Sequence, residues 1–220
     1  MTNARVPGSA SEELVRLLET SANVQIAGTA SRARVLLNEG AQVDDRMREA
    51  VQRIGERFEF YRDGFAPRLL DEADAGLSLL YELFTVSPVP RRSIDAQDRI
   101  DLPSGNWKAQ HDGLWDALVP SSGAATTVQG ELIRVTGRIR TELHDNGGAN
   151  WDADYALMAA SIPAMLRQGT PIDAELTEEA SSLADSILTT DTADRLAELA
   201  VCWVAANREP LPLAQPAYRR

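Results

Sequence analysis

Cysteine, histidine and lysine are scarce in this 220-residue sequence. The single cysteine, Cys202, excludes an intrachain disulfide and a zinc site built from several cysteines. Its apolar neighbours in the sequence predict a small buried core residue. The two histidines, His111 and His144, are too few for a di-iron bundle, which needs a Glu-x-x-His pair on each of two helices. Lys108 is the only lysine among 22 basic residues, a usage typical of GC-rich bacterial genomes.

Long apolar runs and familiar catalytic motifs are also missing. The longest apolar run, Leu199 to Ala206, is far shorter than the roughly 20 residues of a transmembrane helix. Residues Met1 to Ala10 lack the apolar stretch of a signal peptide. The patterns GxSxG, HExxH, CxxC and GxxxxGK[ST] do not occur. We therefore expect a cytoplasmic protein that does not enter a membrane.

Aromatic residues make up only 5% of the chain, against 44% apolar residues in total. A core of Leu, Ile, Val and Ala suits packed helices better than a β-sandwich. Apolar residues recur at steps of three and four in several segments, most clearly at Met47, Val51, Ile54, Phe58 and Tyr61. The sequence therefore predicts an all-α fold, an irregular or orthogonal multi-helix bundle of seven to nine helices.

Helix start signals divide the chain into these elements. We expect helices to begin near these residues: Ser11, Ser31, Asp44 or Asp45, Pro67, Asn106, Thr126 or Thr127, Asn150, Thr170, and Asp191 or Thr192. The stretch 77–86 is compatible with a buried strand, but its unbroken connection to Pro67 favours a helix. Pro163 should kink or break the helix that contains it.

Proline and glycine mark one long connection, at residues 87–106. It separates an N-terminal helical lobe, 1–86, from a C-terminal helical lobe, 107–208. We expect the two lobes to share a core. Residues 209–220 form a proline-containing tail, which we expect to be loosely held.

The formal net charge is −11, and most of the excess lies in the second half of the chain. Residues 145–198 contain 11 acidic residues against only Arg167 and Arg195. Such a surface repels nucleic acid and anionic membranes and attracts a basic protein. Acidity that serves only solubility explains the same numbers equally well.

The stretch from Trp107 to Tyr155 contains both histidines and three of the four tryptophans. Trp107, His111 and Trp115 are spaced four residues apart and so share one helix face. They indicate either a buried aromatic seam, which we favour, or the wall of a ligand pocket with His111 as acid or base. Gly130 and Gly137 indicate that another group approaches the backbone closely, and we favour a helix over a ligand.

Polar residues follow on the same predicted helix. Gln129, Glu131, Arg134 and Arg138 are compatible with structural ion pairs, Glu131 with Arg134 and Arg138 with Glu142. In a cleft, Glu131 would instead be a general base, and Arg134 would bind an anion. We favour the structural interpretation.

Residues that can bind metals gather at the end of this helix and after it, where the His144 imidazole and the carboxylates of Asp145 and Asp152 are candidates for a metal site. Helix capping explains the same residues without a metal. We therefore expect no metal and no cofactor.

Three functions fit the sequence. The leading hypothesis is a non-catalytic binding module, such as a bacterial immunity or antitoxin-type inhibitor, whose acidic region 145–198 meets a basic protein. The second is an enzyme or small-ligand receptor with a pocket around Trp107–His144, with His111, Glu131 and His144 as catalytic candidates and Trp107, Trp115, Gln129, Arg134 and Arg138 as ligand contacts. The third is a helical scaffold or homo-oligomer. The sequence favours a binding protein over an enzyme.

Overall fold

The computed structural model describes residues 7–92, 98–187 and 189–219, and this part of the chain is all-α. It contains nine α-helices, two short 3₁₀ turns and no strand beyond an isolated bridge between Thr127 and Pro212. The prediction of an all-α, multi-helix fold is confirmed. The chain divides into two compact units, Met1–Arg92 and Ser93–Arg220, so the division falls within the predicted connection 87–106.

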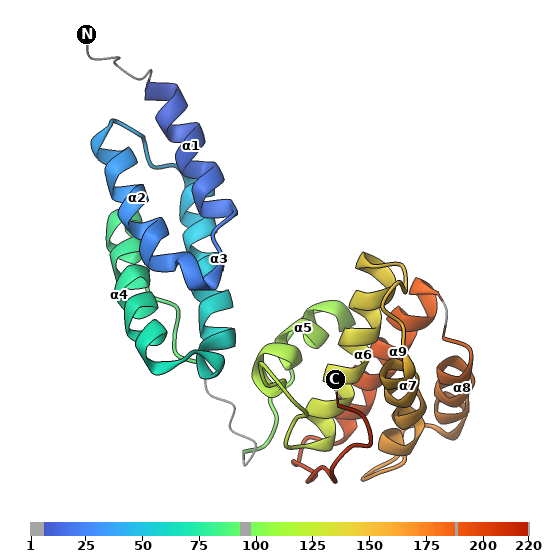
Figure 1. Cartoon of the computed structure of the whole chain (residues 1–220). Coiled ribbons are helices and arrows are strands. Elements are labelled where there is room, and N and C mark those ends of the chain that lie inside the picture. Colours follow the sequence, from blue (N-terminus) through green and yellow to red (C-terminus); the bar gives the residue numbers. More distant parts are fainter. Residues whose placement is uncertain (1–6, 93–97, 188, 220) are drawn as a thin grey trace. The chain divides into compact units, whose positions relative to one another are not determined.

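The N-terminal unit consists of four helices lying lengthwise beside one another (Figure 1). They are α1 Pro7–Glu19, α2 Ile26–Asn38, α3 Asp45–Tyr61 and α4 Pro67–Phe84, with 3₁₀ turns at Asn23–Gln25 and Arg62–Gly64. Their aliphatic side chains form a hydrophobic cluster that belongs to this unit. A second hydrophobic cluster belongs to the C-terminal unit, and the expectation of one core shared by both lobes stays a prediction.

Local sequence explains where α3 and α4 begin. The Asp44 carboxylate accepts a hydrogen bond from the Met47 N–H at 2.8 Å, which satisfies a free amide at the start of α3. Pro67 occupies the first turn of α4, where its missing N–H costs nothing. The helix then runs to Phe84, which confirms helix rather than strand for residues 77–84. Tyr61 departs from the predicted stripe, because it ends α3 with 45% of its surface exposed.

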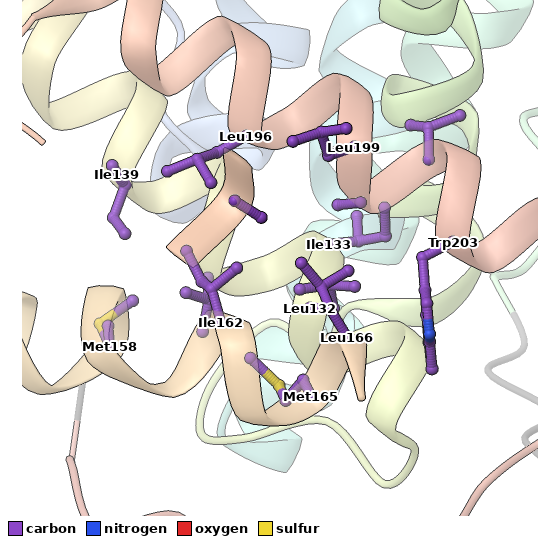
Figure 2. Close-up of a cluster of buried hydrophobic side chains, with 14 of the residues drawn as sticks. Leu132, Ile133, Ile139, Met158, Ile162, Met165, Leu166, Leu196, Leu199 and Trp203 are labelled. Carbon is purple, nitrogen blue, oxygen red and sulfur yellow. The ribbon is translucent and has the colours of Figure 1, made fainter. Parts of the chain in front are cut away.

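The C-terminal unit contains five helices arranged around one of them. They are α5 Trp107–Leu118, α6 Val128–Asp145, α7 Ala153–Leu166, α8 Ala174–Asp185 and α9 Thr190–Ala206. Helix α6 packs against α5, α7 and α9 (Figure 1). Figure 2 shows Leu132 and Ile133 of α6 between Leu199 of α9 and Leu166 of α7. Every residue from 128 to 137 is buried, so α6 is the centre of this unit.

Several predicted helix boundaries are wrong by a few residues. Helix α1 begins at Pro7 rather than after Ser11, and α2 begins at Ile26 rather than near Ser31. The caps of α7, α8 and α9 are Asp152, Asp173 and Thr189 rather than Asn150, Thr170 and Asp191. Each true cap has another capping residue close by in the sequence, and tertiary contacts select between them. Helix α7 also continues through Pro163 and is not broken there.

Cys202 is exposed, so the prediction of a buried cysteine is wrong. Its sequence neighbours Val201 and Trp203 are both buried, but a rotation of about 100° per residue places Cys202 on a different side of α9. That side also carries Glu198, one turn earlier. Burial of the thiol is only partial, yet together with the Glu198 charge it raises the pKa of Cys202.

Helices α2 and α4 approach each other at Gly76. A Cβ atom at this position would lie 2.6 Å from the Cα of Ala27, which is backbone and cannot move aside. Gly28, on α2, has open space where its Cβ would be. The two glycines therefore make a matched pair for testing this contact.

We expect Gly76→Ala to destabilise the N-terminal unit by about 1–3 kcal/mol, because the added methyl group forces α2 and α4 apart. Gly28→Ala should instead raise stability by up to about 1 kcal/mol through helix propensity. Hydrogen exchange followed by mass spectrometry measures both, since peptides from α2 and α4 report this unit directly. Equal exchange in the two variants would contradict the close contact.

Candidate functional site

The polar residues of α6 that suggested chemistry are buried and paired. Gln129, Glu131, Arg134, Thr136 and Glu142 all lie in the interior of the C-terminal unit. No buried side-chain nitrogen or oxygen in the described residues lacks a hydrogen-bond partner. Gln129 and Glu131 hydrogen-bond the C-terminal segment, whereas Thr136, on another side of α6, contacts His111 of α5.

Gln129 joins the start of α6 to the C-terminal segment. Its amide nitrogen donates to the carbonyl oxygens of Asn207 and Glu209, at 2.8 and 2.7 Å. Its amide oxygen accepts from the Leu211 N–H at 3.0 Å. The Leu211 carbonyl in turn accepts from the Val128 N–H at 2.8 Å. The expectation of a loose tail at 209–220 is therefore wrong for the residues up to 219, because buried amide and backbone groups bind this segment.

Glu131 and Arg134 form a buried ion pair, with side-chain exposures of 0% and 1%. Two guanidinium nitrogens donate to the carboxylate, at 2.6 and 2.8 Å. The carboxylate also accepts from the Ala125 N–H at 2.8 Å and from the Tyr218 hydroxyl at 2.7 Å. The predicted Glu131–Arg134 pair is present, and its partners tie the loop before α6 and the C-terminal segment to one carboxylate.

These contacts set the protonation state of Glu131. Burial alone would raise the pKa of its carboxyl group, but the hydrogen bonds from Arg134 and Ala125 outweigh burial and hold the pKa below the ordinary value. An ionised carboxylate with four donors around it is a structural anchor. A general base would need a free acceptor facing a substrate.

His111 is buried on the opposite side of α6. Its Nε2 lies 3.3 Å from the Thr136 hydroxyl, and only 3% of the residue is exposed. Burial lowers the pKa of His111 to about 4, so the ring is neutral at neutral pH. Thr136 follows Glu131 by five residues, which corresponds to about 140° around the helix. The structure therefore does not bring His111 and Glu131 to one cleft.

The glycines of α6 allow this close packing. A Cβ at Gly137 would lie 2.6 Å from the Trp115 ring and 3.0 Å from Cε1 of His111. A Cβ at Gly130 would lie 2.9 Å from the Leu118 carbonyl oxygen. The prediction that a helix approaches the backbone at these glycines is confirmed, and that helix is α5.

His144 takes part in a surface cluster around Asp194 of α9. The Asp194 carboxylate lies 3.0 Å from His144 Nε2, 2.6 Å from Arg140 Nε and 3.1 Å from Lys108 Nζ. Partial burial would raise the pKa of Asp194, but hydrogen bonds from Arg140 and Lys108 outweigh it and lower the pKa. Trp107 is half-buried beside this cluster, with Arg140 5.8 Å from its ring centroid.

The metal candidates are used in separate places. His144 contacts Asp194, Asp152 caps α7, and Asp145 is exposed at the end of α6. Within the described residues, no group of three or more His, Cys, Asp or Glu side chains is arranged to hold a metal ion. Asn150, once a candidate cap, instead donates from its N–H and its side chain to Glu142.

The remaining candidate ligand contacts are Trp115 and Arg138, which take no part in the Glu131–Arg134 pair. Trp115 is half-buried against Gly137, and Arg138 is half-buried on α6. Sequence reasoning missed the partners from distant segments, chiefly Tyr218, Asn207 and Asp194. No local pattern marks them, because each meets α6 only after the chain has folded back.

None of the helices in the described ranges is both long and apolar enough to span a membrane. Comparisons of the chain with protein-family models, with curated proteins and with solved structures found no match. The fold places the chain in the all-α, multi-helix class, which by itself does not imply a function.

We expect His111 to make the stability of the C-terminal unit depend on pH. The folded state keeps His111 neutral down to about pH 4, whereas the unfolded chain protonates it near 6.5. Stability should therefore fall as the pH drops from 6.5 towards 4, by up to about 3 kcal/mol from this residue. Urea unfolding followed by tryptophan fluorescence measures this unit, because all four tryptophans lie in it.

Replacing His111 by Gln should flatten this part of the pH profile, whatever the variant's stability at pH 7. His144→Gln is the comparison variant, because it removes the other histidine of this unit, which is exposed beside Asp194. An unchanged slope in the His111→Gln variant would show that His111 is not the group responsible.

We expect Glu131→Gln to cost the C-terminal unit about 3–5 kcal/mol, because it leaves the Arg134 charge buried without its counter-ion. Glu179→Gln is the matched control, since Glu179 pairs with Arg195 at the surface and should cost less than about 1 kcal/mol. Urea unfolding by tryptophan fluorescence again gives both values. Similar losses in the two variants would contradict the central role of the buried pair.

Proposed function

We propose that the protein is a non-catalytic binding protein whose C-terminal unit recognises a basic partner protein through the exposed face of α8. The observation that carries the proposal is a row of exposed carboxylates along this helix. Glu175, Glu178 and Asp185 fall within about 80° of one another around the helix. All three are exposed, and none forms an ion pair with a described residue.

The opposite side of α8 faces the protein. Ala180 and Ala184 are buried there, and α8 packs against α7 and α9 at the edge of the C-terminal unit (Figure 1). The carboxylate row therefore points away from the unit's own core. Solvent reaches it along most of the helix, which suits an encounter surface.

Nearby arginines do not neutralise this row. Arg195 donates to Glu179 and Glu198, which lie on the side of α8 and on α9. Arg167 donates to the Ser181 hydroxyl at 3.2 Å. The three outer carboxylates thus keep their charge available, and their field favours a partner rich in arginine or lysine.

An inhibitor of the immunity or antitoxin type is the particular function that fits such a chain. These proteins act by covering a partner, so they need a complementary surface rather than reactive groups. The same field disfavours nucleic acid and anionic membranes as partners. Formation of homo-oligomers through apolar helix faces stays a separate prediction, which light scattering tests.

The pocket hypothesis around Trp107–His144 receives less support. His111 and Glu131 lie on different sides of α6, and each is held by internal partners. Helix packing alone explains why His111 and Glu131 are buried and paired, so neither residue requires a substrate as a partner. We therefore retain the binding proposal alone.

We expect reversal of the α8 row, with Glu175, Glu178 and Asp185 all changed to Lys, to abolish capture of the basic partner. The control changes Glu12, Asp63 and Asp71 of the N-terminal unit to Lys, which shifts net charge equally while leaving α8 intact. Affinity capture from a native lysate, quantified by mass spectrometry, compares the two variants with the unaltered protein.

The expected result is at least one basic protein retained by the unaltered protein and the control but lost from the α8 variant. The rate at which this basic protein associates with the unaltered protein should fall at least tenfold between about 50 and 300 mM salt, since electrostatic attraction mainly accelerates encounter. Identical capture by all three proteins would refute a role for α8. Recovery of no basic protein would count against the whole proposal.

A further inference from the structure

An apolar pocket lies between α7 and the C-terminal segment, away from the α8 row. Its volume is about 310 Å³. Helix α7 contributes Leu157, Ala160 and Ala164, and the C-terminal segment contributes Leu213, Pro216 and Tyr218. No charged side chain is among the described residues that line it.

The wall formed by the C-terminal segment is fixed by buried contacts. The Leu213 N–H donates to the Thr126 carbonyl at 3.1 Å, and the Tyr218 hydroxyl donates to Glu131 at 2.7 Å. Tyr218 is itself buried, and burial raises the pKa of its phenol. The pocket is therefore formed before any ligand arrives, which reduces the entropic cost of binding.

Only neutral polar groups reach the pocket. Ser161 and Gln168 line it from α7 and the residues just after it. The Ser161 hydroxyl donates to the Met158 carbonyl at 2.6 Å and also contacts the Tyr218 hydroxyl. A hydroxyl oxygen has two lone pairs, so Ser161 can still accept a hydrogen bond from a ligand. A charged ligand would lose hydration here without gaining a counter-ion.

Size limits the ligand further. An apolar cavity of about 150 Å³ holds benzene, so a volume twice as large holds roughly twelve non-hydrogen atoms. Leu157 lines the pocket and has 44% of its surface exposed, so a bound hydrocarbon would cover apolar surface that water now contacts.

We propose that this pocket binds a neutral small molecule with a hydrocarbon body and a single hydroxyl or carbonyl group. The hydrocarbon part packs against Leu157, Ala164 and Leu213, and the polar group hydrogen-bonds Ser161 or Gln168. This site is independent of the partner surface on α8, and it does not require that surface to be correct.

The test uses 1-naphthol, a neutral two-ring molecule with one hydroxyl, and protein labelled with ¹³C at the methionine methyl groups. Met165 lines the pocket, whereas Met47 lies in the N-terminal unit and serves as an internal control. We expect 1-naphthol to shift the Met165 signal saturably, with a Kd of roughly 10 µM to 1 mM, and to leave Met47 unchanged.

Two variants fill the pocket from opposite walls, Ala164→Leu from α7 and Ala214→Leu from the C-terminal segment. Each should weaken 1-naphthol binding at least about tenfold. Ala156→Leu is the matched control, because Ala156 is exposed on α7 and does not line the pocket. Unchanged Met47 and Met158 signals without ligand verify that each variant is folded.

The ionised analogue 1-naphthoate tests the class of ligand and should bind at least about tenfold more weakly than 1-naphthol. The inference is overturned if Met165 does not respond to 1-naphthol at up to about 5 mM. It is equally overturned if both filling variants bind as well as the control. Equal binding of 1-naphthoate would exclude a neutral ligand as the preferred class.

Discussion

The ion pair between Glu131 and Arg134 is the interaction on which the C-terminal unit depends. Removing both charges from water is costly, and the cost is recovered only if every oxygen and nitrogen finds a partner. The structure meets this condition by directing the Ala125 N–H and the Tyr218 hydroxyl to the same carboxylate. The Glu131 carboxylate therefore holds both the loop before α6 and the C-terminal segment in place.

This arrangement changes the meaning of the polar residues on α6. Glu131 and His111 look like an acid and a base in the sequence. In the structure, four donors surround the Glu131 carboxylate, His111 contacts Thr136, and the two residues lie on different sides of α6. The features of this unit that can bind another molecule are therefore the apolar pocket and the exposed face of α8. The apolar pocket exists because the Glu131–Tyr218 contact holds one of its walls, and α8 displays its carboxylates because its other side is packed.

Particular residues show how far the sequence could lead to this site. The glycines of α6 predicted the close approach of a helix, because this is a local property of one helix. The spacing of Trp107, His111 and Trp115 predicted a buried seam, but only His111 is buried and both tryptophans are half-buried. The hydrogen bonds between the Gln129 side chain and the backbone of residues 207–211 were not predictable, because they join segments about 80 positions apart. Cys202 was misjudged because neighbours in sequence stand on different sides of a helix.

By itself, the sequence determined the helical class, the positions of most helices and the uneven distribution of charge. Side-chain spacing, capping residues and composition act over a few residues, so they can be interpreted without knowing the fold. Only the tertiary structure decided which polar groups are buried, which cap is used and where the C-terminal segment lies. Those outcomes depend on contacts between distant segments, where the cost of burying a charge is set by partners that no local pattern reveals.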